Sequence, residues 1–362
     1  MEDEFCIAEK VTTATEEYIL KPNQHSAYEK EVFIQPVRSE YVIYKAKSKG
    51  FKTFAMYYIA LQAALQKKNV LLFSLGDLNE SMSLKRLFGL LLHKPSMANQ
   101  ANKTVKVPHI DCLKNKHNTC LSIHRDGNTS YQDSDGDFND GYKRCIACSK
   151  LKKPFPVCVT HTLENTGDLI TQMDVSNAIK ALKKHMGENA VFDFYSFSAC
   201  DKTVEDISNI VADYFEHGKP IDLVVIDYWG QLKVPRGYER SPLFEQVTKQ
   251  AVDLKNMCTK FNIACVIADQ ATIRPTESGV SSDDLLTESS FTGGQNKITY
   301  TASCINSSVQ SEDRKNGTIK VHVSMSRYGF GDTQSDGYIL TTCPVACGLF
   351  AQESFYVTSE HI

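Results

Sequence analysis

Apolar runs of strand length alternate with longer helical stretches along most of this 362-residue chain. The apolar runs predict strands at 41–44, 70–74, 191–195, 223–227, 264–268, 302–307 and 318–325. Helical periodicity between them predicts helices at 53–66, 175–186, 204–215 and 243–261. Parallel strands need long crossover connections, usually helices, so the alternation predicts an α/β fold. We expect a mostly parallel sheet flanked by helices, with a binding crevice at the carboxyl ends of its strands.

The composition is that of a globular chain, with 42% hydrophobic and 23% charged residues. No apolar run approaches the roughly 18 residues that cross a bilayer, which excludes a membrane-spanning protein. The first ten residues, MEDEFCIAEK, are acidic where a secretory signal is basic and then apolar, so we expect the protein to stay in the cytoplasm. The net charge of -3 excludes a generally cationic nucleic-acid coat but leaves room for local basic patches.

The segment IDLVVIDYWGQL runs from a buried strand straight into Asp227. A carboxylate at the carboxyl end of such a strand suits the Mg²⁺ of a bound nucleotide, because a hard cation needs a fixed anionic oxygen. This favours a Walker B element. Taken alone, the segment is equally consistent with a buried strand that leaves the sheet on an aspartate. Trp229, which follows, is predicted to be a packing residue.

Residues 46–53, AKSKGFKT, have the length and the last two residues of the phosphate loop GxxxxGK[ST]. Lys52 would contact the β- and γ-phosphates and Thr53 would bind Mg²⁺, with Ala46, Lys49 and Gly50 completing the loop. Both glycines of the pattern are replaced, by Ala46 and by Phe51, and Phe51 adds bulk where the backbone turns around phosphate. Taken alone, the octet favours a basic turn before a core helix.

Two later segments change that balance. The apolar run 264–268 leads to Asp269 and Gln270, and a glutamine at that edge can hydrogen-bond a γ-phosphate. The last predicted strand, 318–325, is followed by Arg327. The segment between them carries Gly293 and Gly294 and leads into the strand at 302–307.

In this order the segments resemble the ATPase core of DnaB-type replicative helicases, within the RecA-like superfamily, over residues 40–330. IDYWGQL is similar to the Walker B element, IADQATIR to the glutamine motif and SMSRYG to the motif with the arginine finger. Bacteriophage members are the most similar, and some of them have alanine at the position of Ala46. For a viral chain, the cytoplasm would be that of the host.

The resemblance implies a mechanism. Lys52, Thr53 and Asp227 would hold Mg-ATP, Gln270 would sense the γ-phosphate, and Arg327 would act in the site of the neighbouring subunit of a homo-hexameric ring. Loops within 271–300 would contact single-stranded DNA in the central channel, through residues that combine charge and backbone freedom: Arg274, Gly293, Gly294 and Lys297.

The chain departs from this family at the position of the catalytic glutamate. Gly76 stands there, and Asp77 could take over the role only if the backbone shifts, because neighbouring strand residues point to opposite faces. Met325 also replaces a lysine two residues before the finger. Together with Phe51, these changes predict slow or conditional hydrolysis.

An insertion at 102–160 is rich in Asn, Asp, Gly and Lys and carries Cys112, Cys120, Cys145 and Cys148. A CxxC pair suits tetrahedral Zn²⁺, and a loop-built segment with few apolar residues needs such a crosslink, so we predict a structural four-cysteine zinc site. Uncoordinated thiols, or ligation through His109, His117, His124 or Cys158, are the alternatives. The phage helicases have a similar insertion. Residues 103–153 hold ten basic residues against six acidic ones, which favours a nucleic-acid contact slightly.

We expect four segments: an N-terminal extension (1–39), a RecA-like core (40–335), the insertion (102–160) and a C-terminal strand and tail (336–362). The resemblance implies an ATP-dependent DNA helicase or translocase of phage replication, using ATP, Mg²⁺ and Zn²⁺. Its partners would be single-stranded DNA, its own copies, and the primase, polymerase or loader of the replisome. The alternative is a hydrolysis-deficient paralogue that binds single-stranded DNA or assists replisome assembly. A recombinase of the wider superfamily would form a filament instead of a ring.

Overall fold

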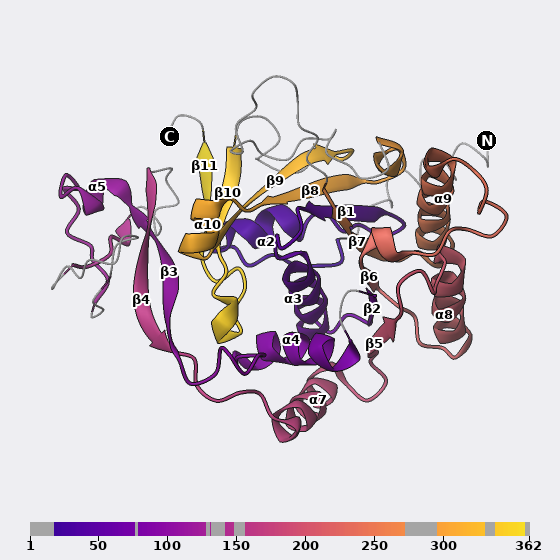
Figure 1. Cartoon of the computed structure of the whole chain (residues 1–362), viewed down its shortest axis with the longest axis horizontal. Coiled ribbons are helices and arrows are strands. Elements are labelled where there is room, and N and C mark those ends of the chain that lie inside the picture. Colours follow the sequence, from indigo (N-terminus) through magenta and orange to yellow (C-terminus); the bar gives the residue numbers. More distant parts are fainter. Residues whose placement is uncertain are drawn as a thin grey trace, which may run out of the picture.

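The computed structural model describes residues 18–76, 79–127, 131, 142–147, 156–271, 295–329 and 337–358. Nine strands form one sheet: β1 (Tyr41–Ala46), β2 (Val70–Leu75), β5 (Phe192–Phe197), β6 (Leu223–Asp227), β7 (Ala264–Gln270), β8 (Ser303–Ser308), β9 (Thr318–Ser326), β10 (Gly337–Thr342) and β11 (Ser354–Thr358). Their order is β11-β10-β9-β8-β1-β7-β6-β2-β5 (Figure 1). The strands from β8 to β5 are parallel, and β9, β10 and β11 extend the sheet antiparallel.

Helices cover both faces of this sheet (Figure 1). One face packs against α2 (Ala27–Val32), α3 (Lys52–Leu65), α4 (Glu80–Leu92) and α7 (Gln172–Met186). The other packs against α8 (Val204–Glu216) and α9 (Leu243–Phe261). Every residue of β1, β2 and β6 is buried, as expected for parallel strands with helices on both sides. No helix among the described residues is both long and apolar enough to cross a membrane.

The parallel sheet and its flanking helices confirm the prediction from the alternating pattern. The bounds of β6 and α9 are those predicted, and the other predicted elements differ by three residues or fewer at either end. The described part of the N-terminal extension packs against the sheet and α3. Tyr28, Val32 and Phe33 in and after α2 are fully buried in the same apolar cluster as α3, so this part of the extension belongs to the core.

The insertion leaves the core as a two-stranded antiparallel ribbon, β3 (Thr104–Cys112) with β4 (Val157–Asn165). The two strands form a sheet of their own and are paired along their whole length. The expectation of a purely loop-built insertion was wrong here. Alternate residues such as Val105 and Val107 follow the two-residue period of a strand, and regular backbone pairing satisfies their N–H and C=O groups.

Glu353, just before β11, fastens the insertion to the main sheet. Its carboxylate accepts hydrogen bonds from Nη1 of Arg144 at 2.5 and 2.6 Å and from the backbone N of Ile110 at 2.9 Å, and it lies 3.1 Å from Nδ1 of His109. Burial acts to raise the pKa of Glu353, but His109 and Arg144 outweigh it and hold the pKa below its usual value. The ionised carboxylate is therefore the form that holds the insertion in place.

We predict that Glu353→Gln loosens this attachment. A lowered pKa means that the contribution is present above the unfolded-state value of 4.5 and is lost as the pH falls through the folded-state pKa. At pH 7 the substitution should cost about 2 kcal/mol and speed amide hydrogen exchange in β3 and β4, with a smaller difference from wild type in acid. Glu216→Gln, at an exposed position on α8, is the control. Unchanged exchange at pH 7 would contradict the prediction.

Candidate functional site

The polar side chains of Ser74, Asp227 and Gln270 lie at the carboxyl ends of parallel strands, on one face of the sheet. Val225 and Ala268 pack into the same apolar cluster as α3, and Asp227 and Gln270 stand two residues further along β6 and β7. Residues two apart on a strand share a face, so both point to the α3 side. β2 pairs Ser74 with Asp227 in register. The parallel pairing thus gathers these groups beside the loop that joins β1 to α3.

That loop depends on Gly50. Its backbone N donates to the carbonyl of Lys47 at 3.0 Å, closing a tight turn. A Cβ at this position would stand 2.8 Å from the Lys47 oxygen and 3.0 Å from the Cβ of Ala46, so a side chain would force the turn open. The glycine that the sequence retains is therefore the one that the loop geometry requires.

Phe51 has the backbone conformation that a glycine adopts easily. Its φ of 59° and ψ of 18° lie in the left-handed region, which costs a residue with a side chain about 1–2 kcal/mol. The ring turns towards α3, with its centroid 6.2 Å from that of Phe54, and packs against the core. Phe51 therefore keeps the left-handed backbone conformation that a glycine would adopt here. Its ring lies against α3.

The first turn of α3 has no side-chain cap. Phe51 forms no cap hydrogen bond and the first turn has no acidic residue, whereas α4, α7 and α8 are capped by Asn79, Thr171 and Thr203. The N–H groups at the start of α3 therefore point their positive potential at the loop, the arrangement that binds phosphate. Lys52 is 8% exposed, and its Nζ lies 5.3 Å from the ring centroid of Tyr228.

The side chains at this edge fit a nucleotide with Mg²⁺. Asp227 is only 4% exposed and ends β6, and Thr53 is the second residue of α3. A carboxylate and a hydroxyl are hard oxygen donors, the kind that Mg²⁺ prefers. Lys52, one residue before Thr53, adds the positive charge that a triphosphate needs.

Tyr57 lies close to Asp227, on the inner side of α3. It lies one helical turn beyond Thr53 and is fully buried. Burial is the largest effect on its pKa, the hydroxyls of Ser83 and Ser74 act against it, and the nearby Asp227 carboxylate adds to it, giving a pKa of about 12. A neutral phenol thus stands beside the carboxylate. Only the spacing of four residues from Thr53 could have indicated this from the sequence.

Gly76, which replaces the glutamate of the resembling family, stands where no other residue fits. Its φ is +76°, and a Cβ there would lie 2.6 Å from the Cβ of Ala199 and 2.8 Å from its backbone N. The backbone N of Gly76 also donates to Phe197 O at 2.9 Å, which holds the two chain segments together. Asp77, the predicted substitute, lies outside the described residues.

We therefore predict that Gly76→Glu destabilises the protein without creating a catalytic base. The left-handed backbone costs about 1–2 kcal/mol and the clash with Ala199 adds to it, so the unfolding temperature should fall by several degrees. Gly237→Ala is a matched control, because Gly237 has φ +83° but no atom within 4 Å of its built Cβ. A variant Gly76→Glu as stable as Gly237→Ala would show that Ala199 does not restrict this position.

Arg327 lies at the opposite edge of the sheet. Its backbone N donates to Ala302 O at 2.8 Å, and Ala302 N donates to Tyr41 O at 2.9 Å, which places it beside the amino end of β1. Its exposed guanidinium donates to the carbonyl of Thr299. The phosphate loop follows the other end of β1, about 20 Å away along the strand. Arg327 is therefore beyond the reach of the phosphate loop of its own chain.

The predicted DNA contacts have different outcomes. Arg274, Gly293 and Gly294 lie outside the described residues. Lys297 is in the short helix η2 (Gln295–Ile298), and its side chain is only 3% exposed and ion-paired with Asp269. The expectation of a surface lysine that contacts DNA does not agree with this position. The buried carboxylate of Asp269 needs a compensating cation, and Lys297 supplies it.

The cysteines of the insertion lie together in part. Cys112, Cys120 and Cys145 belong to one cluster with strands β10 and β11, and Sγ of Cys120 is 3.9 Å from Sγ of Cys145. Asp111 accepts hydrogen bonds from the backbone N of Cys112 and of Cys145, at 2.6 and 3.0 Å. Cys148 lies outside the described residues, and within those residues no group of three or more His, Cys, Asp or Glu side chains is placed to hold a metal ion.

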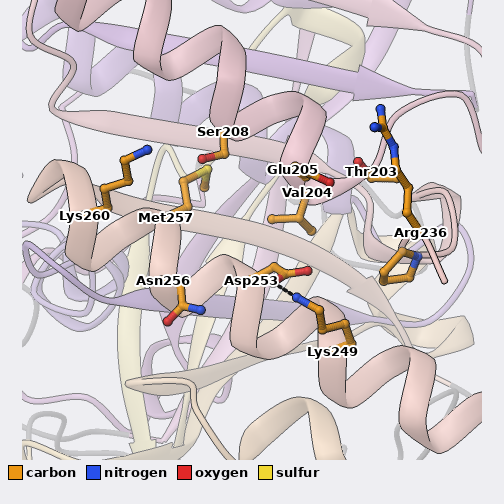
Figure 2. Close-up of a pocket in the computed structure, with 11 residues that line it drawn as sticks. Thr203, Val204, Glu205, Ser208, Arg236, Lys249, Asp253, Asn256, Met257 and Lys260 are labelled. Carbon is orange, nitrogen blue, oxygen red and sulfur yellow. Dashed lines mark hydrogen bonds and ion pairs between the residues drawn. The ribbon is translucent and has the colours of Figure 1, made fainter. Parts of the chain in front are cut away.

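A cavity of about 390 Å³ lies between α8 and α9 (Figure 2). Its lining is mostly polar, and Lys249 forms an ion pair with Asp253 on its α9 side. Because α8 and α9 cover the face of the sheet opposite to α3, this cavity is separate from the phosphate loop.

Comparison with solved structures identifies the architecture. A structure described as an ATPase domain superposes on 97% of this chain and 97% of its own, with a TM-score of 0.58 and 14% identity. A DnaB-like replicative helicase, described with its interactions with primase, matches 97% of this chain and 66% of its own, with a TM-score of 0.57 and 13% identity. The fold is that of a DnaB-type ATPase domain. No protein-family model and no curated protein matches the sequence. The predicted fold class, an α/β ATPase fold with a mostly parallel sheet, is confirmed.

Proposed function

We propose that this chain is the ATP-driven motor of a DnaB-like replicative helicase. The observation that carries the proposal is the site at the carboxyl edge of the sheet, where Asp227 and Gln270 face the uncapped start of α3. Lys52 and Thr53 would bind the phosphates and Mg²⁺, and Asp227 would complete the metal site. Gln270 would sense the γ-phosphate. Mg²⁺ bound there would neutralise charge on the phosphates.

The ring assembly follows from the position of Arg327. An exposed guanidinium at the edge opposite the phosphate loop would act only in the site of another subunit, which is the arrangement of an arginine finger in trans. Repeating that contact head to tail closes a ring, and we propose a homo-hexamer. Single-stranded DNA would pass through its centre, contacted by the connection between β7 and η2. Primase, polymerase and loader contacts are proposed as partners of such a motor.

Gly76 at the end of β2 supports slow ATP hydrolysis. With Gly76 fixed by Ala199, no glutamate stands at the end of β2 to activate water. Tyr57, the phenol close to Asp227, is neutral at pH 7 and would not take a proton from the attacking water. The same observation favours the second candidate, a hydrolysis-deficient paralogue that binds ATP and single-stranded DNA and helps to assemble the replisome.

ATP turnover with and without single-stranded DNA tests the motor. We predict DNA-stimulated turnover that Lys52→Ala and Arg327→Ala each reduce to background. A mixture of these two variants should recover activity, because a Lys52→Ala subunit still donates its finger to the intact phosphate loop of an Arg327→Ala neighbour. With random mixing, about a quarter of the interfaces would be complete.

The controls separate the two candidates. Arg327→Ala should still bind ATP, whereas Lys52→Ala should not. Activity that stays at background in the mixture would contradict a finger in trans. Wild-type protein that binds ATP and single-stranded DNA but has no turnover would overturn the motor and support the hydrolysis-deficient paralogue.

We further propose that Cys112, Cys120, Cys145 and Cys148 bind one structural Zn²⁺. Two thiolates on a tetrahedral zinc, each at about 2.3 Å, stand about 3.8 Å apart, and Cys120 and Cys145 are 3.9 Å apart at Sγ. The two N–H bonds to Asp111 hold the backbones of Cys112 and Cys145 together. The local excess of basic residues around this site would favour a nucleic-acid contact.

Metal analysis of the purified chain tests this site. We predict about one zinc per chain, lost in Cys145→Ser together with protection of the insertion from protease. Cys200→Ser, at an exposed cysteine outside the insertion, should keep the metal. A folded, protease-resistant protein without zinc would refute the proposal.

A further inference from the structure

The ion pair between Asp269 and Lys297 is almost completely removed from water. Its side chains are 1% and 3% exposed, and Nζ of Lys297 lies 2.8 Å from both carboxylate oxygens. Burial raises the pKa of Asp269 above its usual value, although the charge of Lys297 and, to a smaller extent, that of the fully buried Lys45 oppose the shift. A buried pair contributes little net stability compared with apolar residues of similar size. We therefore examine which elements the ion pair holds in position.

Lys297 contacts the elements on either side of the pair. Its backbone carbonyl accepts a hydrogen bond from the hydroxyl of Tyr41 at 2.9 Å, which ties η2 to β1. Its Nζ lies 5.1 Å from the ring centroid of Trp229, and the indole N–H of Trp229 donates to Gln250 at 2.8 Å. Trp229 opens the short helix η1 (Trp229–Gln231), two residues after Asp227. A movement of Lys297 would therefore displace Trp229, two residues after Asp227.

Asp269 and Gln270 are neighbours on opposite faces of β7. Gln270 points to the α3 side, so Asp269 points to the α9 side, where it meets Lys297. β1 pairs Ala46 with Gln270, and the backbone N of Ala271 donates to Ala46 O at 2.9 Å. The end of β7 is thus fixed to the start of the phosphate loop on one side and to η2 on the other.

We propose that the Asp269–Lys297 ion pair is a positioning device that couples DNA contact to the phosphate-sensing end of β7. The inference rests on the proposed function, in which the connection between β7 and η2 contacts single-stranded DNA. The pair joins the two ends of that connection. Tension on η2 would pass through Lys297 to Asp269 and turn the adjoining Gln270 relative to the phosphate loop. Lys297 acts through Asp269 and is a positioning residue.

The double substitution Asp269→Asn with Lys297→Met tests this coupling. Either single substitution leaves a charge or a polar group buried without its partner and should lower the unfolding temperature. The double variant removes both charges and should recover part of the stability, because the fully buried Lys45, which is paired in register with Asp269 on β1, also loses this carboxylate. We predict that it keeps wild-type ATP affinity, DNA affinity and DNA-independent turnover, while the DNA stimulation of kcat falls about fivefold or more.

A matched control is the pair Lys249 and Asp253 on α9, at the cavity between α8 and α9 (Figure 2). Lys249→Met with Asp253→Asn removes the same two charges at a partly exposed site and should leave stimulation unchanged. A merely structural pair would change stability and leave the ratio of stimulated to basal kcat as it is.

The outcomes separate the inference from the proposed function. Wild type without DNA stimulation would overturn the proposed function and this coupling with it. Stimulated wild type together with an equally stimulated double variant would overturn the coupling alone. If the variant Asp269→Asn with Lys297→Met does not fold, Asp269→Leu with Lys297→Met can replace it and distinguishes the same two outcomes. An apolar pair of similar volume often replaces a buried ion pair without loss of stability.

Discussion

The parallel pairing of β1, β7, β6 and β2 is the constraint on which the site depends. It brings the carboxyl ends of these strands to one edge, and the alternation of side chains places Asp227 and Gln270 on the α3 side. The same alternation places Asp269 on the α9 side, in contact with Lys297. One sheet edge therefore presents the groups of the proposed nucleotide site on one face and a buried ion pair on the other. Gln270 and Asp269, which belong to the two sets, are neighbours in β7.

Phe51 and Gly76, the two departures from the helicase pattern, have different structural consequences. Phe51 replaces a glycine and still adopts its left-handed backbone, so strain of about 1–2 kcal/mol is stored in the loop while its ring packs against Phe54. At Gly76, where the resembling family has a glutamate, Ala199 occupies the space that a side chain would need. The first departure preserves the course of the loop before α3, and the second leaves out the residue that is the catalytic base in the resembling family. We infer a site that retains nucleotide binding more fully than hydrolysis.

Much of the fold could be predicted from the sequence because apolar periodicity reports burial directly. The strands ending at Asp227 and Gln270, and the helix after Thr53, were found in this way, and β6 was predicted to the residue. Three features were not. The polar composition of the insertion gave no sign of the β3–β4 ribbon. The charge of Lys297 suggested a surface position, and nothing in the sequence placed Tyr57 close to Asp227. In each case the position depends on a partner far away in the sequence. The partner is β4 for β3, Asp269 for Lys297 and Asp227 for Tyr57.

A structure of the chain with Mg²⁺ and a non-hydrolysable ATP analogue tests the central claim most directly. We expect the triphosphate at the start of α3, in contact with Lys52, and the metal between Thr53 and Asp227. The ring of Phe51 should remain on Phe54. A nucleotide bound elsewhere, such as in the cavity between α8 and α9, or a Phe51 ring that occupies the phosphate position, would contradict it.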